Sequence, residues 1–175
     1  MRAVLFSTLF TLFTGIESVN FPFESIQLKE KDIEIFSAIA FADRYNSPPK
    51  ADCKAFPGTK QWPVEDVWAQ LNSSLDGALL KPAIPASACY DGPQKNVDFC
   101  NYLVYNTSTA RFYLNDPISV LTEWPEGDTC PTLINPPGNC TQGGFSTYFV
   151  DVATVKQVQI AVNFARNNNI RLVVK

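Results

Sequence analysis

The clearest alternation of apolar and polar positions lies in residues 148–175. Residues 148–152 are rich in β-branched and aromatic side chains, which favours a short strand. Thr154 and Gln157 have the spacing of a capping box, in which a hydroxyl and an amide side chain satisfy free backbone groups at a helix start. We therefore expect a strand over 148–152 and a helix that begins at Thr154.

Apolar side chains recur at helical spacing through this predicted helix. Five of them share one arc: Val155, Val158, Ala161, Val162 and Ala165. Ile160 and Phe164 lie outside the arc and widen the apolar face. A face of this breadth predicts that the helix packs against more than one neighbour.

A second strand is expected over residues 170–174, after three asparagines that tolerate a left-handed turn at a helix end. Strand, helix and strand in such close succession predict a parallel βαβ unit with a right-handed connection. Lys175 follows the second strand directly, and open α/β sheets bind ligands beyond the carboxyl ends of their strands.

Upstream, residues 20–46 favour a helix, and Pro48 and Pro49 then predict a loop. A second helix is predicted to start at Trp62 and Pro63 and to end at Gly77. Its apolar face consists of Val64, Val67, Trp68, Leu71 and Leu75. An extended segment with two leucines and two prolines follows over 79–85.

Residues 89–144 are expected to be irregular, because turn-forming Gly, Pro and Asp residues recur through them. Cys89 and Cys100, and likewise Cys130 and Cys140, are spaced to close short disulfide loops. Four cysteines allow three pairings, and spacing alone does not choose among them. Cys53 is the fifth cysteine and has no obvious partner.

Composition narrows the class of protein. The chain has 175 residues, 46% of them apolar, and a net charge of −3 without a basic cluster. These values indicate a packed core, and they favour neither a nucleic-acid partner nor an anionic membrane.

Residues 1–18 have the charged start and short apolar stretch of a secretory signal peptide. Asn72, Asn106 and Asn139 each begin an N-glycosylation triplet.

Few kinds of catalysis are open to these residues. There is no histidine, so a Ser-His-Asp triad is excluded, and the Cys-x-x-Cys and glycine-rich phosphate-loop motifs are missing. Two pairs of carboxylates remain, Glu123 with Glu126 and Asp116 with Glu123. We interpret them as solvated loop acids, because no pattern aligns them across a cleft.

The C-terminal stretch, from Tyr-Phe-Val-Asp-Val to Ile-Arg-Leu-Val-Val-Lys, resembles the opening of the FAD-binding domain of secreted fungal oxidases. These oxidases are of the p-cresol methylhydroxylase and vanillyl-alcohol oxidase type, in the berberine-bridge-enzyme-like branch. The resemblance continues upstream through these motifs: Phe56-Pro-Gly, Trp62-Pro, Trp68-Ala-Gln-Leu-Asn, Cys89-Tyr, Asn115-Asp-Pro, Trp124 and Cys140-Thr-Gln-Gly-Gly. At Cys53 the chain departs from the family, because Ala55 and Gln61 stand where the family often has two further cysteines.

The resemblance implies an α+β chain in three parts: a signal peptide (1–18), an N-terminal cysteine-containing region (19–145) and the truncated start of an FAD-binding domain (146–175). In the family, a loop after the second strand wraps the FAD pyrophosphate, and this chain does not contain that loop. Val173, Val174 and Lys175 are the only residues that family topology would place near the flavin.

Two hypotheses follow. In the first, the chain is the N-terminal part of a secreted FAD-dependent oxidoreductase that oxidises an alcohol, a sugar or a secondary metabolite with dioxygen, and the part alone is inactive. In the second, it is a small secreted module, stapled by disulfides, that binds or supports other molecules without catalysis. The apolar strand over 170–174 favours the first, because folded proteins seldom leave such an edge uncovered.

Overall fold

The computed structural model describes residues 21–43, 53–119 and 127–175. The predicted signal peptide, the proline loop after residue 46, and Glu123 and Glu126 lie outside the described residues. In chain order the elements are η1 (Pro22–Ser25), α1 (Glu30–Ile35), η2 (Ser37–Ile39), α2 (Glu65–Ser74), β1 (Leu79–Leu80), η3 (Pro85–Cys89), α3 (Val97–Asn106), α4 (Ala110–Asn115), β2 (Phe149–Val150) and α5 (Val155–Asn167).

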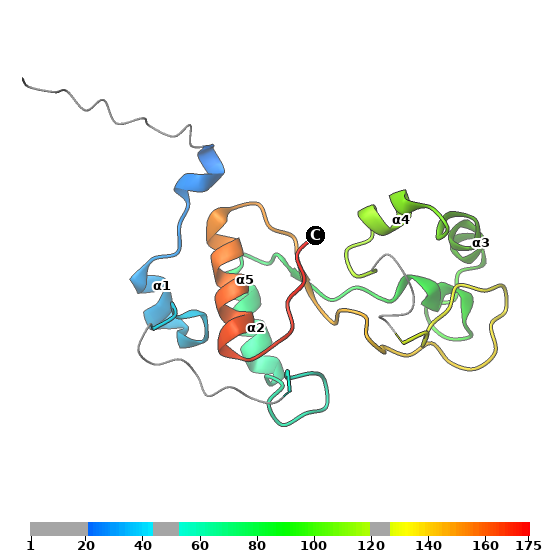
Figure 1. Ribbon diagram of the computed structural model, residues 1–175, viewed down its shortest axis with the longest axis horizontal. Helices are drawn as coiled ribbons and strands as arrows, with labels where there is room; N and C mark the ends of the chain where they lie inside the picture. The colour runs from blue at the N-terminus through cyan, green and yellow to red at the C-terminus, as the bar shows by residue number, and fades with distance from the viewer. Residues whose placement is uncertain (1–20, 44–52, 120–126) are drawn as a thin grey trace, which may run out of the picture.

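The described residues build two separate apolar cores. The helical core lies among α1, η2, α2 and α5 and consists of Leu28, Phe36, Ile39, Trp68, Leu71, Leu75, Ile160 and Phe164. The stapled core lies beside α3 and η3 and consists of Ala86, Cys89, Tyr90, Cys100 and Cys130. Figure 1 shows α1, α2 and α5 grouped on one side and α3 and α4 on the other. The helical core contains residues from both sides of the expected domain boundary at 145/146.

Helix α5 begins as the sequence predicts. The Thr154 hydroxyl accepts a hydrogen bond from the Gln157 amide at 3.3 Å, and the Gln157 side chain accepts from the backbone of Thr154 at 3.2 Å. This reciprocal cap satisfies donors that the first turn would otherwise leave free.

The predicted apolar arc of α5 is only partly right. The helix buries Ile160 and Phe164 most deeply, whereas Val158 and Val162 remain 44% and 42% exposed. Two polar residues, Gln157 and Asn163, are buried with them. Asn163 donates to the Ile39 carbonyl at 3.1 Å, and Gln157 donates to the Leu75 carbonyl at 3.0 Å. The buried face of α5 therefore includes two polar residues that satisfy neighbouring backbone carbonyls, and a search for apolar positions does not identify them.

Helix α2 (Glu65–Ser74) is present where the sequence predicts a helix, but it begins after Trp62 and Pro63 and ends before Gly77. Trp68, Leu71 and Leu75 are buried in the helical core, while Val64 precedes the first turn and is exposed. After the C-cap Leu75, Asp76 and Gly77 have φ +57° and +86°, and the Gly77 amide donates to the Asn72 carbonyl at 2.9 Å. A left-handed residue at this place satisfies carbonyls that the last turn leaves free.

Aromatic rings surround Trp68 at the centre of the helical core. The ring centroid of Trp68 lies 4.2 Å from that of Tyr148, 5.0 Å from Trp62 and 5.1 Å from Phe164. Its indole N–H donates to the Pro63 carbonyl at 3.1 Å. A buried tryptophan with its donor satisfied adds both contact area and direction to the packing.

The stapled core contains two disulfides, Cys89–Cys100 and Cys130–Cys140. The expectation of irregular structure over 89–144 is wrong for residues 97–106 and 110–115, which form α3 and α4. Asn96 caps α3 by accepting from the Phe99 amide at 2.9 Å. Because Cys100 lies on α3, the first disulfide ties this helix to η3.

The predicted parallel βαβ unit is wrong. β2 pairs antiparallel with β1, with Leu79 opposite Val150 and Leu80 opposite Phe149. Residues 171–175 form no strand, and Ile170 makes only an isolated parallel bridge with Ala55. The partner of β2 therefore comes from the segment after α2, and no right-handed crossover joins β2 to residues 170–174.

The single helix expected over residues 20–46 is broken in the described part of that range. Only Glu30–Ile35 is α-helical, between the 3-10 turns η1 and η2. The breaks bring this segment onto α5, where the Ile26 carbonyl accepts from the Lys156 amide at 2.8 Å. The Leu28 amide likewise donates to the Gln159 side chain at 2.8 Å.

Candidate functional site

The segment that follows α5 is fixed where it leaves the helix. Asn169 has φ +52°, and its side-chain amide donates to the Cys53 carbonyl at 2.7 Å. The Ala55 amide donates to the Asn169 carbonyl at 2.9 Å, and the Ile170 amide donates to the Ala165 carbonyl at 2.8 Å. The asparagine turn expected after the helix therefore also anchors residues 53–55.

Residues 171–175 are exposed along their whole length. Val174 is 84% exposed, and Leu172 and Val173 are about half exposed. Three large aliphatic side chains in a short exposed segment form an apolar edge that the described residues leave uncovered. The sequence predicts an apolar strand over residues 170–174. These residues do expose apolar side chains, but residues 171–175 form no strand.

Lys175 reaches the turn that follows α4. Its ammonium group donates to the Tyr113 carbonyl at 2.6 Å and to the Asp116 carbonyl at 2.7 Å, and it also contacts the Ser119 carbonyl. Cations near the end of a helix stabilise its last carbonyls. The end of the segment is thus held by the half of the molecule that contains the stapled core.

Asp116 shapes the turn that receives Lys175. Its carboxylate accepts from the Ile118 amide at 3.1 Å and from the Ser119 amide at 2.7 Å. Such a bond from Asp to amides further along the chain is typical of turns. The sequence motif Asp116-Pro117 predicted a turn, but nothing in it indicated that Lys175 would bind there.

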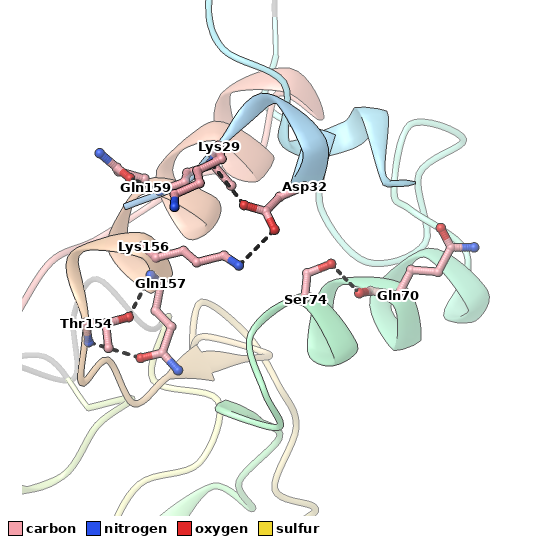
Figure 2. Close-up of polar contacts among 9 residues, drawn as sticks. Lys29, Asp32, Gln70, Ser74, Thr154, Lys156, Gln157 and Gln159 are labelled. Atoms are coloured by element: carbon pink, nitrogen blue, oxygen red, sulfur yellow. Dashed lines mark hydrogen bonds and ion pairs between the residues drawn. The ribbon is translucent and has the colours of Figure 1, made fainter. Parts of the chain in front are cut away.

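Neither the start of α5 nor Lys175 fits an FAD pyrophosphate site. Such a site needs free backbone N–H groups, usually at a helix start, or cationic side chains. At the start of α5 the Ala153 and Thr154 amides donate to Gln157, the Lys156 amide donates to Ile26, and the Gln157 amide donates to Thr154. Figure 2 shows this cap with its side chains turned toward the helix backbone. The ammonium of Lys175 is also already bonded to carbonyls.

An ion pair joins α5 to α1 near the same cap. The Lys156 ammonium lies 2.9 Å from the Asp32 carboxylate, and the Lys29 amide donates to the same carboxylate at 3.0 Å (Figure 2). The hydrogen bond from Lys156 lowers the pKa of Asp32 below its ordinary value of 3.8, and the bond from the Lys29 backbone lowers it further. The pair connects two elements that pack around the helical core.

Within the described ranges, no group of His, Cys, Asp and Glu residues has an arrangement that would hold a metal ion. A small hollow of about 20 Å³ lies beside the stapled core, between Pro85, Phe112 and Phe145. A space of that volume suits about one water molecule. None of the helices in these ranges has the length and apolar character needed to cross a membrane.

The three predicted glycosylation acceptors lie in different surroundings. Asn72 is in α2 and accepts from the Leu79 amide at 3.1 Å, and Asn106 ends α3 and donates to the Tyr102 carbonyl at 2.7 Å. Asn139 is exposed in the loop beside Cys140. Cys53 is an exposed free cysteine.

Comparison with known proteins identifies relatives over most of the chain. The chain is 29% identical to the FAD-linked oxidoreductase orf1 of Neocamarosporium betae over 142 residues, which are 79% of this chain and 24% of that protein. It is 31% identical to the VAO-type flavoprotein oxidase VAO615 of Thermothelomyces thermophilus over 143 residues, with the same two shares. The chain thus spans about a quarter of the length of these relatives. No family model matches it.

Two solved structures have the same fold over the matched part. The crystal structure of the VAO-type flavoprotein MtVAO615 of Myceliophthora thermophila C1 superposes with a TM-score of 0.62 at 32% identity, covering 70% of this chain and 23% of that one. MtVAO713 of the same organism gives 0.60 at 34% identity, covering 69% and 22%. The resemblance seen in the sequence is therefore confirmed, and the chain is a homologue of the FAD-linked oxidoreductases of the VAO type, of which it matches about a quarter.

Proposed function

We propose that this chain is the N-terminal part of a secreted FAD-dependent oxidoreductase. The observation that carries the proposal is its match to solved VAO-type flavoproteins, which covers about 70% of the chain but only 22 to 23% of those proteins. Neither the start of α5 nor Lys175 fits a pyrophosphate site, so the proposal assigns flavin binding to the intact protein and not to this part alone.

For the intact protein we propose oxidation of an alcohol, a sugar or a secondary metabolite. The flavin would accept a hydride from a substrate carbon, and dioxygen would reoxidise it to give hydrogen peroxide. One relative is named a flavoprotein oxidase, which supports dioxygen as the acceptor. The substrate would be a small molecule, and no nucleic acid or membrane enters the reaction.

The role that we propose for this part is to position the chain that leads to the cofactor. Asn169 fixes the start of the exposed segment against Cys53, and Lys175 fixes its end against the turn after α4. A segment held at both ends presents Val173 and Val174 in a defined direction. We assign these two residues and Lys175 to the edge that faces the flavin domain.

Secretion is the second element of the proposal. The signal-like residues 1–18 and three glycosylation triplets favour it, and the two disulfides suit an oxidising compartment. The disulfides would then stabilise a half of the molecule whose apolar core is small.

A self-sufficient module without activity is the competing function. Two features favour it: the two closed cores, and the finding that every buried side-chain N or O atom among the described residues has a hydrogen-bond partner. The exposed apolar edge at residues 172–174 argues against a self-sufficient module. Folded proteins usually cover such a segment or place charged side chains on it.

Expression of two forms tests the proposal. The first form is the 175-residue chain, and the second is the product of the transcript read beyond the Lys175 codon. We expect the longer form to purify with flavin absorbance and to release hydrogen peroxide with a suitable alcohol or sugar, and the shorter form to remain colourless. Stoichiometric FAD on the shorter form would contradict the missing pyrophosphate site. A stop codon after Lys175 with a stable, flavin-free secreted product would favour the module.

A further inference from the structure

The glycosylation triplet at Asn139 differs from the other two because a disulfide cysteine is its middle residue. Asn139, Cys140 and Thr141 follow one another, and Cys140 is bonded to Cys130 with a Cα–Cα distance of 4.4 Å. Neither Asn72-Ser-Ser nor Asn106-Thr-Ser contains a cysteine. One short segment therefore contains both a glycosylation triplet and a disulfide cysteine.

The folded structure holds this triplet firmly on its C-terminal side. The Thr141 amide donates to the Thr129 carbonyl at 3.1 Å, and the Thr129 hydroxyl donates to the Thr141 carbonyl at 3.0 Å. Cys130, which follows Thr129, is buried in the stapled core. Thr141 therefore cannot move away without breaking its two hydrogen bonds to Thr129 and displacing the disulfide between Cys140 and the buried Cys130.

Glycan transfer requires an acceptor triplet that is free to move, whereas the folded structure fixes this one. A transferase must surround the acceptor segment so that the asparagine amide and the threonine hydroxyl both reach its active site. Asn139 itself is exposed, but the two residues after it are tethered. From this geometry we propose that glycosylation of Asn139 competes with closure of the Cys130–Cys140 bond, so that the glycan is attached only while that bond is open.

Atoms and electrons balance in each of the two modifications. In the first, the Asn139 Nδ2 bonds to the anomeric carbon of an oligosaccharide carried on a polyprenol pyrophosphate, the carbon–phosphate oxygen bond breaks, and one amide proton is lost. In the second, the thiols of Cys130 and Cys140 give two protons and two electrons to the disulfide of a dithiol oxidoreductase. Whichever modification occurs first limits access to the other.

Neither of the other two acceptors has a disulfide cysteine within its triplet. Asn72 lies in α2, which contains no cysteine, and Asn106 ends α3, six residues after the disulfide-bonded Cys100. The backbone hydrogen bonds around both asparagines open and close reversibly. Their glycan occupancy should therefore follow the rate of folding in general, and only that of Asn139 should follow the state of one disulfide. The inference rests on the proposed secretory route and is independent of flavin binding.

The experiment measures glycan occupancy at all three asparagines by peptide mass spectrometry, on intracellular and secreted chain from a fungal host. All variants carry Cys53→Ser, so that the free thiol cannot form a new bond. Cys130→Ser opens the bond beside Asn139 and leaves its triplet intact. Cys89→Ser is the matched control, because it opens a disulfide loop of similar length that contains no acceptor.

We expect Cys130→Ser to raise occupancy at Asn139 roughly twofold, and a thiol reductant added to the cells to do the same, because both keep Cys140 unpaired. Cys89→Ser should leave Asn139 unchanged relative to Asn72. Full occupancy at Asn139 in the parent, no rise in Cys130→Ser, or an equal rise in Cys89→Ser would each overturn the inference while the secretory route stands. An absence of glycan from all three asparagines would overturn both.

Discussion

The Lys156 ammonium and the Asp32 carboxylate, 124 residues apart in sequence, lie 2.9 Å from each other and join α5 to α1. Their side chains are only 27% and 19% exposed, so solvent screens this pair less than an ordinary surface pair. The contact holds the N-terminal segment against the helix whose start is best defined by the sequence.

Replacing Lys156 by Met should lower the free energy of unfolding by about 0.5 to 1 kcal/mol at neutral pH, the upper range for partly exposed ion pairs. Because the pKa of Asp32 is lowered in the folded chain, this stabilisation is complete above the ordinary value of 3.8 and disappears as the pH falls through the lowered value. Urea unfolding of both proteins at neutral pH and well below pH 3.8 measures the difference.

Lys95→Met is the control for that experiment. It removes the ion pair between Lys95 and Asp91, whose side chain is 94% exposed, and should leave the unfolding curve unchanged. Equal losses in the two variants, or a Lys156→Met loss that persists at acid pH, would contradict the assignment.

Gln157→Leu should destabilise the chain by about 1 to 3 kcal/mol, because it leaves the Leu75 carbonyl and the Ala153 and Thr154 amides without their side-chain partner. Thr154→Ala removes only the hydroxyl cap and should lower stability by about 1 kcal/mol. Thermal unfolding followed by circular dichroism compares both with Gln70→Leu, an exposed glutamine on α2 that should have little effect. If Gln157→Leu were as mild as Gln70→Leu, the buried amide would have no structural role.

Trp68→Ala should lower stability by about 3 to 5 kcal/mol, since it removes the ring that Trp62, Tyr148 and Phe164 surround. Trp68→Phe keeps an aromatic ring but loses the donor to the Pro63 carbonyl, so its effect should be intermediate. Denaturant unfolding monitored by circular dichroism avoids dependence on tryptophan emission. Tyr105→Ala, on an exposed position of α3, should be nearly neutral, and a large loss there would argue against this placement of the core.

Reduction of the two disulfides should open the stapled core before the helical core. Each bond should contribute about 2 to 4 kcal/mol, and the helical core contains no cysteine. Hydrogen exchange with mass spectrometry should therefore show early loss of protection in Val97–Asn106 and retained protection in Glu65–Ser74 and Val155–Asn167. Simultaneous loss in all three helices would mean that the two cores unfold as one unit.

Local signals predicted α5 and α2 well, because their starts and ends depend on neighbouring residues. The Thr154 and Gln157 cap and the Gly77 terminator are both visible in a few letters of sequence and both appear in the structure. For α3 the cap Asn96 was also present in the sequence. The β-branched and aromatic residues that follow it, which suit strands as well, concealed the helix.

Long-range pairing explains the failures. Phe149 and Val150 pair with Leu80 and Leu79, about seventy residues earlier, and periodicity within residues 148–175 contains no information about that partner. Similarly, Asn163 is buried because the Ile39 carbonyl needs a donor, which a count of apolar positions cannot show. The attachment of Lys175 to the turn after α4 depends on tertiary structure in the same way.

Because β1 pairs antiparallel with β2, the segment between these two strands begins and ends at neighbouring positions. Figure 1 shows the two stretches of chain that lead into and out of the half containing α3 and α4. Insertions with neighbouring ends can be lengthened, shortened or exchanged with little effect on the host. Evolution could therefore remodel the half that contains the two disulfides while the half that contains α1, α2 and α5 keeps its architecture.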